Sequence, residues 1–554
     1  YNFANVDNYS VWLNMDSCYN SSNVYCEESG GEKTTDVAVA SGIIGTYYGI
    51  NKIKFNTCVN MGEIYSMSGS VGGIISSVAK QLDYFPETVE QLTLPTIVRS
   101  ELMVEGTSHA NFLEDEMIYN NAGVGSTRKL AEVVFEKCLN VSNAIGGNKQ
   151  TTNWVCKYND KTYQMKSSRY AGGLYGYAED VDITIDSCIG QGNITAVHHD
   201  IGQYSYAGGL AGVTKLHELK GGYTPKLITS TKAGYEFGTN GTYNMLDQKY
   251  IMLDKSVILN PNNNTIGRDE TNGGLIDSAT ISADYAGGLF GYIKSENALQ
   301  GHISENQAVS NRVDMEENIK ISELKDQENN PDLYEIYKSN IGRFVAGSNS
   351  YMHSGVSTVK GMIATSGAIA KFDGDSRETL DGDNTKHTTL VLTNIWNWSK
   401  VVGDDMLSRG EHDQVPNNSG ASGIISETTY VYSLYFDNCV NAGVIDGSNI
   451  YSEVNESGTP KGSNAGGFIA TVSKTDEYGA LSNKNKDDKI INNFKYMEFD
   501  SCTIHETAKV ISTITDYSED FLTSVGGLVG YINTSNETDK FQLRIVSTKG
   551  AITD

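Results

Sequence analysis

Short segments in which apolar and small residues occupy every second position recur along the whole chain. Residues 55–64 are representative: Phe55, Cys58, Asn60, Gly62 and Ile64 keep fixed positions. Period-two alternation places the last four of these on one face of an extended strand. The three-residue step from Phe55 to Cys58 breaks the alternation, so we expect a corner there. Related segments occur around Cys18 and at 185–194, 436–445 and, without cysteine, 543–552.

A second phrase, two glycines flanked by apolar residues, usually falls between copies of the first. One copy reads Val71-Gly-Gly-Ile74, and others begin at Ala171, Ala207, Ala286, Ala465 and Val525, with looser copies at Ser41 and Ser422. Small residues at fixed intervals allow successive turns of the chain to pack closely. One repeat cannot bury its apolar side alone, whereas stacked repeats form a continuous core. We therefore predict an all-β fold, a right-handed parallel β-helix (solenoid) with long loop insertions.

The spacing of the phrases divides the chain into coil segments and insertions. We expect β-helix coils at 1–81, 131–215, 273–294, 346–371 and 420–554, and insertions at 82–130, 216–272, 295–345 and 372–419. Apolar residues at helical spacing within 313–337 and 112–119 indicate that the insertions are partly helical. Long loops on a regular scaffold are where function usually lies.

The Gly-Gly-Leu-x-Gly phrases, alternating with the Asn-Cys-x-Asn-x-Gly phrase, resemble the GLUG-motif repeats of bacterial cell-surface proteins. Those repeats occur in bacterial immunoglobulin-A peptidases and in large adhesin-like proteins. The resemblance covers patches at both ends and in the middle of the chain, and it implies a β-helical stalk module. The long insertions depart from that pattern, so a uniform stalk is not expected. No segment resembles a peptidase active site, so the resemblance does not extend to that activity.

The charge of the chain narrows its partners and its location. A net charge of −26 repels nucleic-acid phosphates and anionic lipid, so we expect neither as a partner. No apolar run has the length of a membrane span, and the start at Tyr1 is not a signal peptide. Both ends are interpreted as cuts through a longer protein. We expect an extracellular or cell-surface location, with any secretion signal or wall anchor outside this sequence.

The cysteines follow the strand register. Of the 8 cysteines, six lie in or near the first phrase: Cys18, Cys58, Cys138, Cys188, Cys439 and Cys502. Residues of equal register in neighbouring coils stack about 4.8 Å apart, which predicts a ladder of buried free thiols rather than a disulfide framework. Cys26 and Cys156 lie outside the phrase, and whether they are paired or reactive stays open. No Cys-x-x-Cys spacing indicates a metal site.

Two groups of residues are candidates for binding. The acidic run Asp373, Asp375, Glu378, Asp381 and Asp383 offers oxygen ligands to calcium, although it lacks the EF-hand pattern, and a solvated turn is the alternative. Trp396 and Trp398 suit contact with a carbohydrate or a protein, or they seal a loop. His198-His199-Asp200 is a poor metal site, because adjacent side chains of a strand point to opposite faces. The sequence contains no Gly-x-Ser-x-Gly elbow, no zinc-protease His-Glu-x-x-His, no phosphate-binding loop and no dinucleotide fingerprint.

These observations favour a non-enzymatic surface module, a stalk or adhesin segment whose inserted loops bind a protein or glycan of a host or neighbouring cell. One alternative is a structural subunit of an extracellular filament, in which further copies stack through open β-helix ends. Another is a polysaccharide lyase or hydrolase, with Asp182, Asp186, Asp437 and Asp500 as outward carboxylates.

Overall fold

The computed structural model describes the chain in segments, and within them it is all β. These segments are 13–26, 39–48, 52–66, 69–79, 132–140, 144–146, 155–158, 161–164, 170–190, 192–196, 204–217, 227–229, 234–236, 268–269, 274–275, 280–295, 328–329, 344–345, 351–353, 358–374, 389–393, 395–397, 399–403, 420–429, 431, 433–448, 463–473, 496–506, 508–512, 524–532, 542–546 and 549–550. No α-helix occurs in them, and none of their elements is a helix able to cross a membrane.

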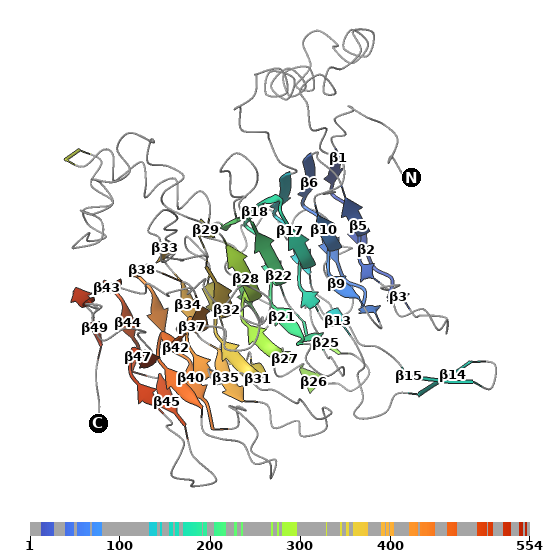
Figure 1. Cartoon of the computed structure of the whole chain (residues 1–554). Helices are drawn as coiled ribbons and strands as arrows, with labels where there is room; N and C mark the ends of the chain where they lie inside the picture. The colour runs from blue at the N-terminus through green and yellow to red at the C-terminus, as the bar shows by residue number, and fades with distance from the viewer. Residues whose placement is uncertain are drawn as a thin grey trace, which may run out of the picture.

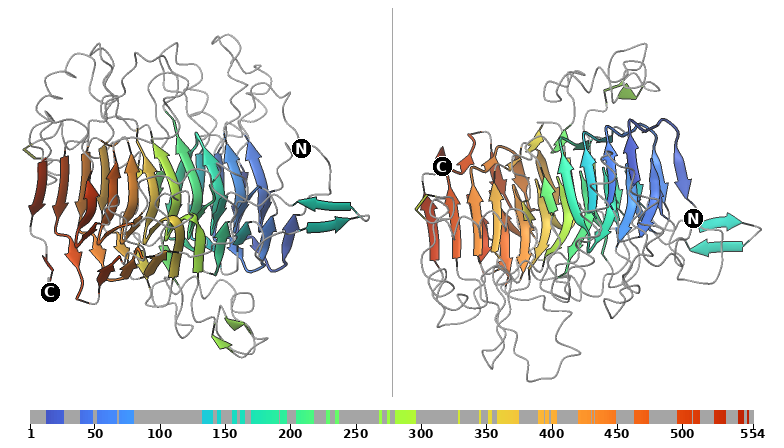
Figure 2. Two further views of the ribbon diagram at one scale, coloured as in Figure 1. Left: turned by 60° about the horizontal axis from the view of Figure 1, so that its bottom comes forward. Right: turned by 90° about the horizontal axis from the view of Figure 1, so that it is seen from above.

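The chain winds as a coil of short strands. One turn consists of β6 (Lys52–Asn56), β7 (Val59–Asn60), β8 (Ile64–Ser66), β9 (Ser70–Gly72) and β10 (Ile75–Ala79). Every strand of this turn pairs in parallel with the equivalent strands of neighbouring turns; β10, for example, lies between β5 (Ile44–Tyr48) and β17 (Tyr175–Glu179). The turns stack in chain order along one axis (Figures 1 and 2). This arrangement is consistent with a β-helix or solenoid.

The first two faces of the coil are built from aligned strands. One face has a 6-stranded sheet of β1 (Leu13–Asp16), β6, β11 (Glu132–Glu136), β18 (Asp182–Asp186), β23 (Leu227–Thr229) and β29 (Phe344–Val345). It continues in a 4-stranded sheet of β33 (Thr389–Thr393), β38 (Ser433–Asp437), β43 (Tyr496–Asp500) and β48 (Gln542–Val546), whose first strand contacts β29. The next face is a 10-stranded sheet of β2 (Tyr19–Asn20), β7, β12 (Leu139–Asn140), β19 (Ile189–Gly190), β24 (Gly234–Glu236), β30 (Tyr351–His353), β34 (Trp396–Asn397), β39 (Val440–Asn441), β44 (Thr503–Ile504) and β49 (Lys549–Gly550).

The remaining faces meet at the glycine phrases. A 16-stranded sheet has β3 (Val24–Cys26), β4 (Ala40–Ser41), β8, β9, β13 (Ala144–Gly146), β16 (Tyr170–Gly172), β20 (Ile194–Ala196), β21 (Tyr206–Gly208), β27 (Thr280–Gly287), β31 (Thr358–Ser366), β35 (Lys400–Gly403), β36 (Gly420–Ser422), β40 (Val444–Asp446), β41 (Asn464–Gly466), β45 (Lys509–Ile511) and β46 (Val525–Gly526). A 9-stranded sheet has β5, β10, β17, β22 (Ala211–Leu216), β28 (Phe290–Ser295), β32 (Ile369–Asp373), β37 (Ile425–Thr429), β42 (Ile469–Ser473) and β47 (Val529–Ile532).

Among the described residues, two antiparallel pairs lie outside these sheets: β14 (Val155–Tyr158) with β15 (Lys161–Gln164), and β25 (Arg268–Asp269) with β26 (Gly274–Leu275). Strands of the coil also lie inside three ranges that the sequence assigned to insertions. They are β23 and β24 within 216–272, β29 within 295–345, and β33, β34 and β35 within 372–419. These strands lack the Cys or Gly-Gly phrase, so the repeat pattern does not reveal them. The stretch 112–119, and 313–337 except for a turn at 328–329, lie outside the described residues.

Stacked aromatic and aliphatic side chains fill the interior of the coil. The rings of Phe55 and Phe135 stack with centroids 5.3 Å apart, and those of Phe436 and Phe499 stack at 4.8 Å. These phenylalanines occupy paired register positions on neighbouring turns. The apolar cluster that contains them extends from Ala40 to Cys502. One continuous core therefore holds the turns together.

The corner before each repeat cysteine has a left-handed backbone. The residue preceding the cysteine has a φ between 51° and 56° in all six copies: Ser17, Thr57, Lys137, Ser187, Asn438 and Ser501. A left-handed residue reverses the local course of the chain and ends one strand before the next begins. This confirms the corner that the broken alternation predicts between Phe55 and Cys58.

The repeat cysteines are free thiols that point into the core. Cys58, Cys138, Cys188, Cys439 and Cys502 are buried, while Cys18 in the first turn is partly exposed. Neighbouring turns place them one above another, and the backbone N–H of Cys138 donates to Sγ of Cys188 at 3.2 Å. The predicted thiol ladder is confirmed, in two runs. Cys26, whose state the sequence left open, is also a free thiol.

Candidate functional site

The described part of the predicted calcium run is a single residue. Asp373 ends β32, and its carboxylate accepts hydrogen bonds from the hydroxyl of Tyr292, at 2.7 Å, and from the hydroxyl of Thr429. Its Oδ1 also lies 3.8 Å from Nζ of Lys371. The other four residues of the run, Asp375, Glu378, Asp381 and Asp383, lie outside the described residues, so the calcium site stays a prediction.

Of the two predicted binding tryptophans, Trp396 is described. It begins β34, pairs in register with Val440 of the following turn, and keeps 40% of its surface exposed. Asn397 beside it is buried, so the two adjacent residues of β34 point to opposite sides of the strand. Trp398 lies outside the described residues, as does the segment 198–200. The binding role of the pair stays a prediction.

The four carboxylates proposed for polysaccharide cleavage fall into two separate groups, and Asp437, expected to point outward, is buried. Asp437 and Asp500 are register partners on β38 and β43. Asp182 and Asp186 lie at the two ends of β18, paired with Glu132 and Glu136 of β11. Both groups belong to one face of the coil but lie several turns apart along the axis. The structure therefore does not join the four residues into one site.

A row of tyrosines lies on the outer side of the coil, where the 16-stranded sheet meets the 9-stranded sheet. We call Tyr170, Tyr177, Tyr206, Tyr285 and Tyr292 the tyrosine seam. Tyr170, Tyr206 and Tyr285 are register partners on β16, β21 and β27, and Tyr177 and Tyr292 occupy one row of β17 and β28. The glycine phrase forms the bend between these strands, so the two rows face each other.

The rings of the seam are in contact from one turn to the next. Tyr170 stacks on Tyr177 with centroids 5.3 Å apart, and Tyr206 stacks on Tyr285 at 5.0 Å. Tyr206 also contacts Tyr292 at 5.2 Å and Tyr170 at 6.0 Å. Tyr285 is buried in a small apolar cluster separate from the main core, whereas the other four are half-buried. The seam is therefore a continuous row of aromatic rings along the coil axis. Its four half-buried rings keep part of their surface exposed.

Charged groups continue the seam toward the C-terminal turns. Lys371 follows Tyr292 in the register of the 9-stranded sheet, and Glu427 follows Lys371. Nζ of Lys371 lies 3.5 Å from Oε1 of Glu427 and 5.7 Å from the ring centre of Tyr285. Both charged side chains are buried, so their attraction is weakly screened by solvent. The buried ammonium group of Lys371 thus lies over the ring of Tyr285.

Burial keeps the hydroxyls of four seam tyrosines protonated. It raises the pKa of Tyr177, Tyr206, Tyr285 and Tyr292 above the usual 10.0 because the phenolate would lose its hydration. The hydroxyl of Tyr177 donates to Oε2 of Glu179 at 2.5 Å, which raises its pKa further. At neutral pH the seam therefore offers neutral rings and hydroxyl groups rather than phenolates.

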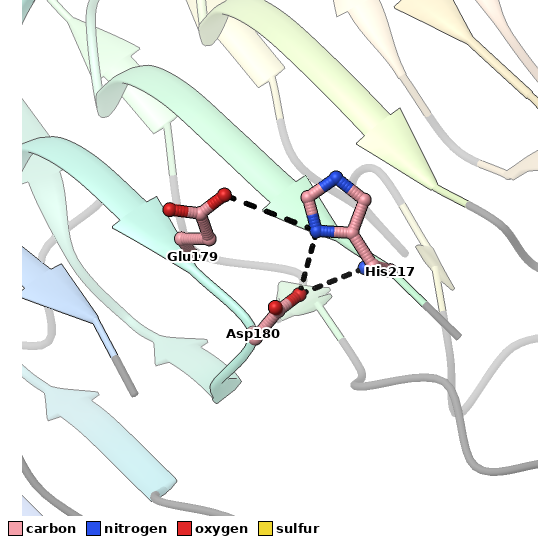
Figure 3. Close-up of side chains that lie close together, drawn as sticks. All are labelled: Glu179, Asp180 and His217. Carbon is pink, nitrogen blue, oxygen red and sulfur yellow. Dashed lines mark hydrogen bonds and ion pairs between the residues drawn. The ribbon is translucent and has the colours of Figure 1, made fainter. Parts of the chain in front are cut away.

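Next to Tyr177, three side chains form what we call the Glu-Asp-His cluster: Glu179, Asp180 and His217 (Figure 3). Nδ1 of His217 lies 3.0 Å from Oδ1 of Asp180 and 3.9 Å from Oε1 of Glu179. The backbone N–H of His217 donates to the same Asp180 oxygen at 2.9 Å. The imidazole nitrogen is thus directed at two carboxylates.

The local fold explains why these residues meet. Only Asp180 and Val181 separate β17 from β18, and Asp180 adopts a φ of 55°, which aspartate tolerates better than most residues. Its N–H donates to the carbonyl oxygen of Lys215 on the next turn at 2.9 Å. His217 directly follows β22, the neighbour of β17. The corner at Asp180 therefore lies beside the end of β22 in the next turn, where His217 begins the following segment.

Sequence reasoning missed both the seam and the cluster. The tyrosines are spread over residues 170–292, and only the register of the coil brings them into two rows. Tyr177 and Tyr292 do share a signal, since each directly follows a Gly-Gly-Leu-x-Gly phrase. Glu179 and His217 lie 38 positions apart in a chain with 68 acidic residues, so no local spacing marks them.

Comparison of the chain with protein-family models, with curated proteins and with solved structures finds no match. The geometry of the described residues is thus the basis for any functional assignment.

Proposed function

We propose that this chain is a non-enzymatic recognition module of an extracellular surface, a right-handed parallel β-helix of the GLUG-repeat kind that binds a glycan chain along the tyrosine seam. The observation that carries the proposal is the seam itself, a strip of four half-buried rings and one buried ring on the outer side of the coil. Right-handedness follows the general rule for crossovers between parallel strands.

The chemistry of the seam suits an elongated, polar ligand. Tyrosine combines an apolar ring face with a hydroxyl, and it is among the residues that most often dominate binding. Ring contacts between 5.0 and 6.0 Å run along the coil axis, so the strip offers similar faces turn after turn. Stacked turns of a solenoid commonly present such extended binding surfaces. A linear glycan, whose sugar rings also repeat along its length, can contact several of these ring faces at once, whereas a compact ligand cannot.

The proposal is tested by screening the purified chain on an array of glycans and matrix proteins. We expect binding to glycans that is weakened by Tyr170→Ala and by Tyr206→Ala. Tyr25→Ala is the matched control, because Tyr25 is 55% exposed on β3, away from the seam. Binding only to proteins, or binding that survives both seam variants, would contradict the proposal. Trp396→Ala tests the predicted tryptophan site in the same screen.

An alternative is a filament subunit whose copies stack end to end through apolar side chains of the last described turn. Leu543 and Ile545 on β48 are register partners of Met497 and Phe499, which are buried. They are 48% and 49% exposed, because no described turn covers them. Sedimentation of the purified chain over a range of concentrations tests this alternative. A monomer at all concentrations, with Leu543→Lys and Ile545→Lys behaving alike, would exclude it.

A further inference from the structure

The Glu-Asp-His cluster has the composition and spacing of a metal site, and we propose that it binds a divalent transition-metal ion of the Zn²⁺ class. Its potential ligand atoms lie within 4.8 Å of one another. Zinc binds imidazole nitrogen and carboxylate oxygen at about 2.0–2.2 Å, which puts ligand atoms of a tetrahedral site about 3.3 Å apart. The distances of 3.0 and 3.9 Å from Nδ1 of His217 bracket that spacing. Small side-chain rotations therefore suffice for coordination.

Surrounding contacts hold the carboxylates in place. Asp180 keeps only 5% of its side chain exposed and is held by the backbone N–H of His217. Glu179 accepts a hydrogen bond from the hydroxyl of Tyr177. Such outer contacts orient ligands in metal sites, and their loss typically weakens metal binding by about 10- to 100-fold. The cluster thus has three ligand candidates and a fixed outer contact for each carboxylate.

The ligand set also selects among metals. Two carboxylates and one imidazole carry a net negative charge, which a divalent cation offsets. Imidazole favours Zn²⁺, Co²⁺ and Ni²⁺, whereas calcium and magnesium prefer sites made only of oxygen. Three protein ligands leave at least one coordination position for water or for a hydroxyl group of a ligand. The inference does not depend on glycan binding, although Tyr177 belongs to both the seam and the outer contacts of the cluster.

The test is a calorimetric titration of the chelator-treated full chain with ZnCl₂. We expect one equivalent to bind, at least tenfold more weakly in His217→Ala and in Glu179→Gln. His505→Ala is the matched control, a partly exposed histidine outside the cluster that should leave the affinity unchanged. A hundredfold excess of CaCl₂ should not displace the zinc. Circular dichroism checks that each variant is folded.

Titration with Co²⁺ separates this site from the thiols. Cobalt bound by nitrogen and oxygen gives visible ligand-field bands without the sulfur-to-metal charge-transfer band that a thiolate produces. Tyr177→Phe should weaken binding about tenfold by removing the hydrogen bond to Glu179. The inference is overturned if the wild-type chain binds no zinc, if His217→Ala binds it equally well, or if the cobalt spectrum shows thiolate coordination.

Discussion

Gly73 leaves room inside the coil for the carboxamide of Asn140, which comes from the next turn. A Cβ atom added at Gly73 would lie 2.5 Å from Cγ of Asn140 and 2.1 Å from the carbonyl oxygen of Gly173. The relationship repeats along the coil at equivalent glycines that follow serine instead of a first glycine, and each meets the asparagine of the next turn: Gly42 with Asn60, Gly367 with Asn397, and Gly423 with Asn441. The glycine of the second phrase and the asparagine of the first phrase therefore pack against each other, and we call this pair the packing unit.

Gly73→Ala should destabilise the coil by about 3 kcal/mol, because the added methyl group meets backbone that cannot move independently of its neighbours. Thermal unfolding followed by circular dichroism measures the change. Gly45→Ala in β5 is the matched control, since nothing lies within 4 Å of a Cβ atom there. Equal melting temperatures for the two variants would contradict the packing unit.

The asparagines form two ladders, Asn20–Asn60–Asn140 and Asn397–Asn441, because Gly190, Tyr235 and Met352 occupy the register positions between them. Nδ2 of Asn60 donates to Oδ1 of Asn140 at 2.8 Å, and Nδ2 of Asn397 donates to Oδ1 of Asn441 at 2.9 Å. The register partner of Asn441 in the following turn is Ile504. Nδ2 of Asn441 is consequently buried without a hydrogen-bond partner among the described residues. The end of the ladder at Asn441 thus leaves this Nδ2 atom without a hydrogen bond among the described residues.

Ile504→Asn should extend the ladder and stabilise the chain by about 1 kcal/mol, because an unsatisfied buried group costs about 1–3 kcal/mol and the lost isoleucine surface offsets part of the gain. Denaturant unfolding measures the difference. Ile504→Ala removes the same apolar side chain without supplying an acceptor, so it should lower stability. A destabilised asparagine variant would show that the space cannot hold a carboxamide.

The left-handed corners are another place where stability can be gained. Thr57 has a φ of 56°, a conformation that costs a β-branched residue about 1–2 kcal/mol. Thr57→Asn should therefore raise the free energy of unfolding by about 1 kcal/mol. The reverse change at the equivalent corner, Asn438→Thr, should lower it by a similar amount. Shifts of the same sign for both variants would be inconsistent with this explanation.

Buried thiols and phenols make the chain sensitive to alkali. Burial raises the pKa of Cys138 and Cys439 above the usual 9.0 and that of Tyr285 above 10.0. In the unfolded chain these groups lose their protons near the usual values, whereas the folded chain retains them. Above about pH 9 the unfolded state therefore binds fewer protons, and stability falls as the pH rises.

The melting temperature should accordingly be constant between about pH 7 and pH 8.5 and fall steadily above about pH 9. Cys138→Ala removes one of the groups and should make the decline shallower. Ellman's reagent offers an independent check, since the buried thiols should react only after unfolding. A flat profile to high pH, or rapid reaction of all thiols in the folded chain, would contradict the buried ladder.

The sequence predicts the regular part of this molecule well for a physical reason. The narrow interior of the coil accepts only certain side chains at positions such as Cys58, Asn60 and Gly73. The spacing of these residues in the sequence therefore predicts the coil, its corners and its thiol ladder. Strands such as β23 and β33 carry ordinary apolar residues and depend on their neighbours in the stack, so no motif marks them. The calcium run and Trp398 were chosen for local composition, and the described residues do not test them.

The outer features depend on register rather than on motif. Tyr170, Tyr206 and Tyr285 become neighbours only when three turns are aligned, and the intervening chain lengths differ. Asp180 lies in the two-residue corner between β17 and β18, and His217 follows β22, which pairs with β17. The two residues therefore meet only when these two turns are aligned. Such contacts between turns require the pairing register as well as the fold class.

The most direct measurement is the affinity of the best glycan from the array, by calorimetry, for the wild-type chain, Tyr170→Ala, Tyr206→Ala and Tyr25→Ala. Recognition along the tyrosine seam predicts at least tenfold weaker binding for both seam variants and an unchanged affinity for Tyr25→Ala, with all four melting cooperatively. Unchanged affinity in the seam variants, or equal losses in all three variants, would contradict it.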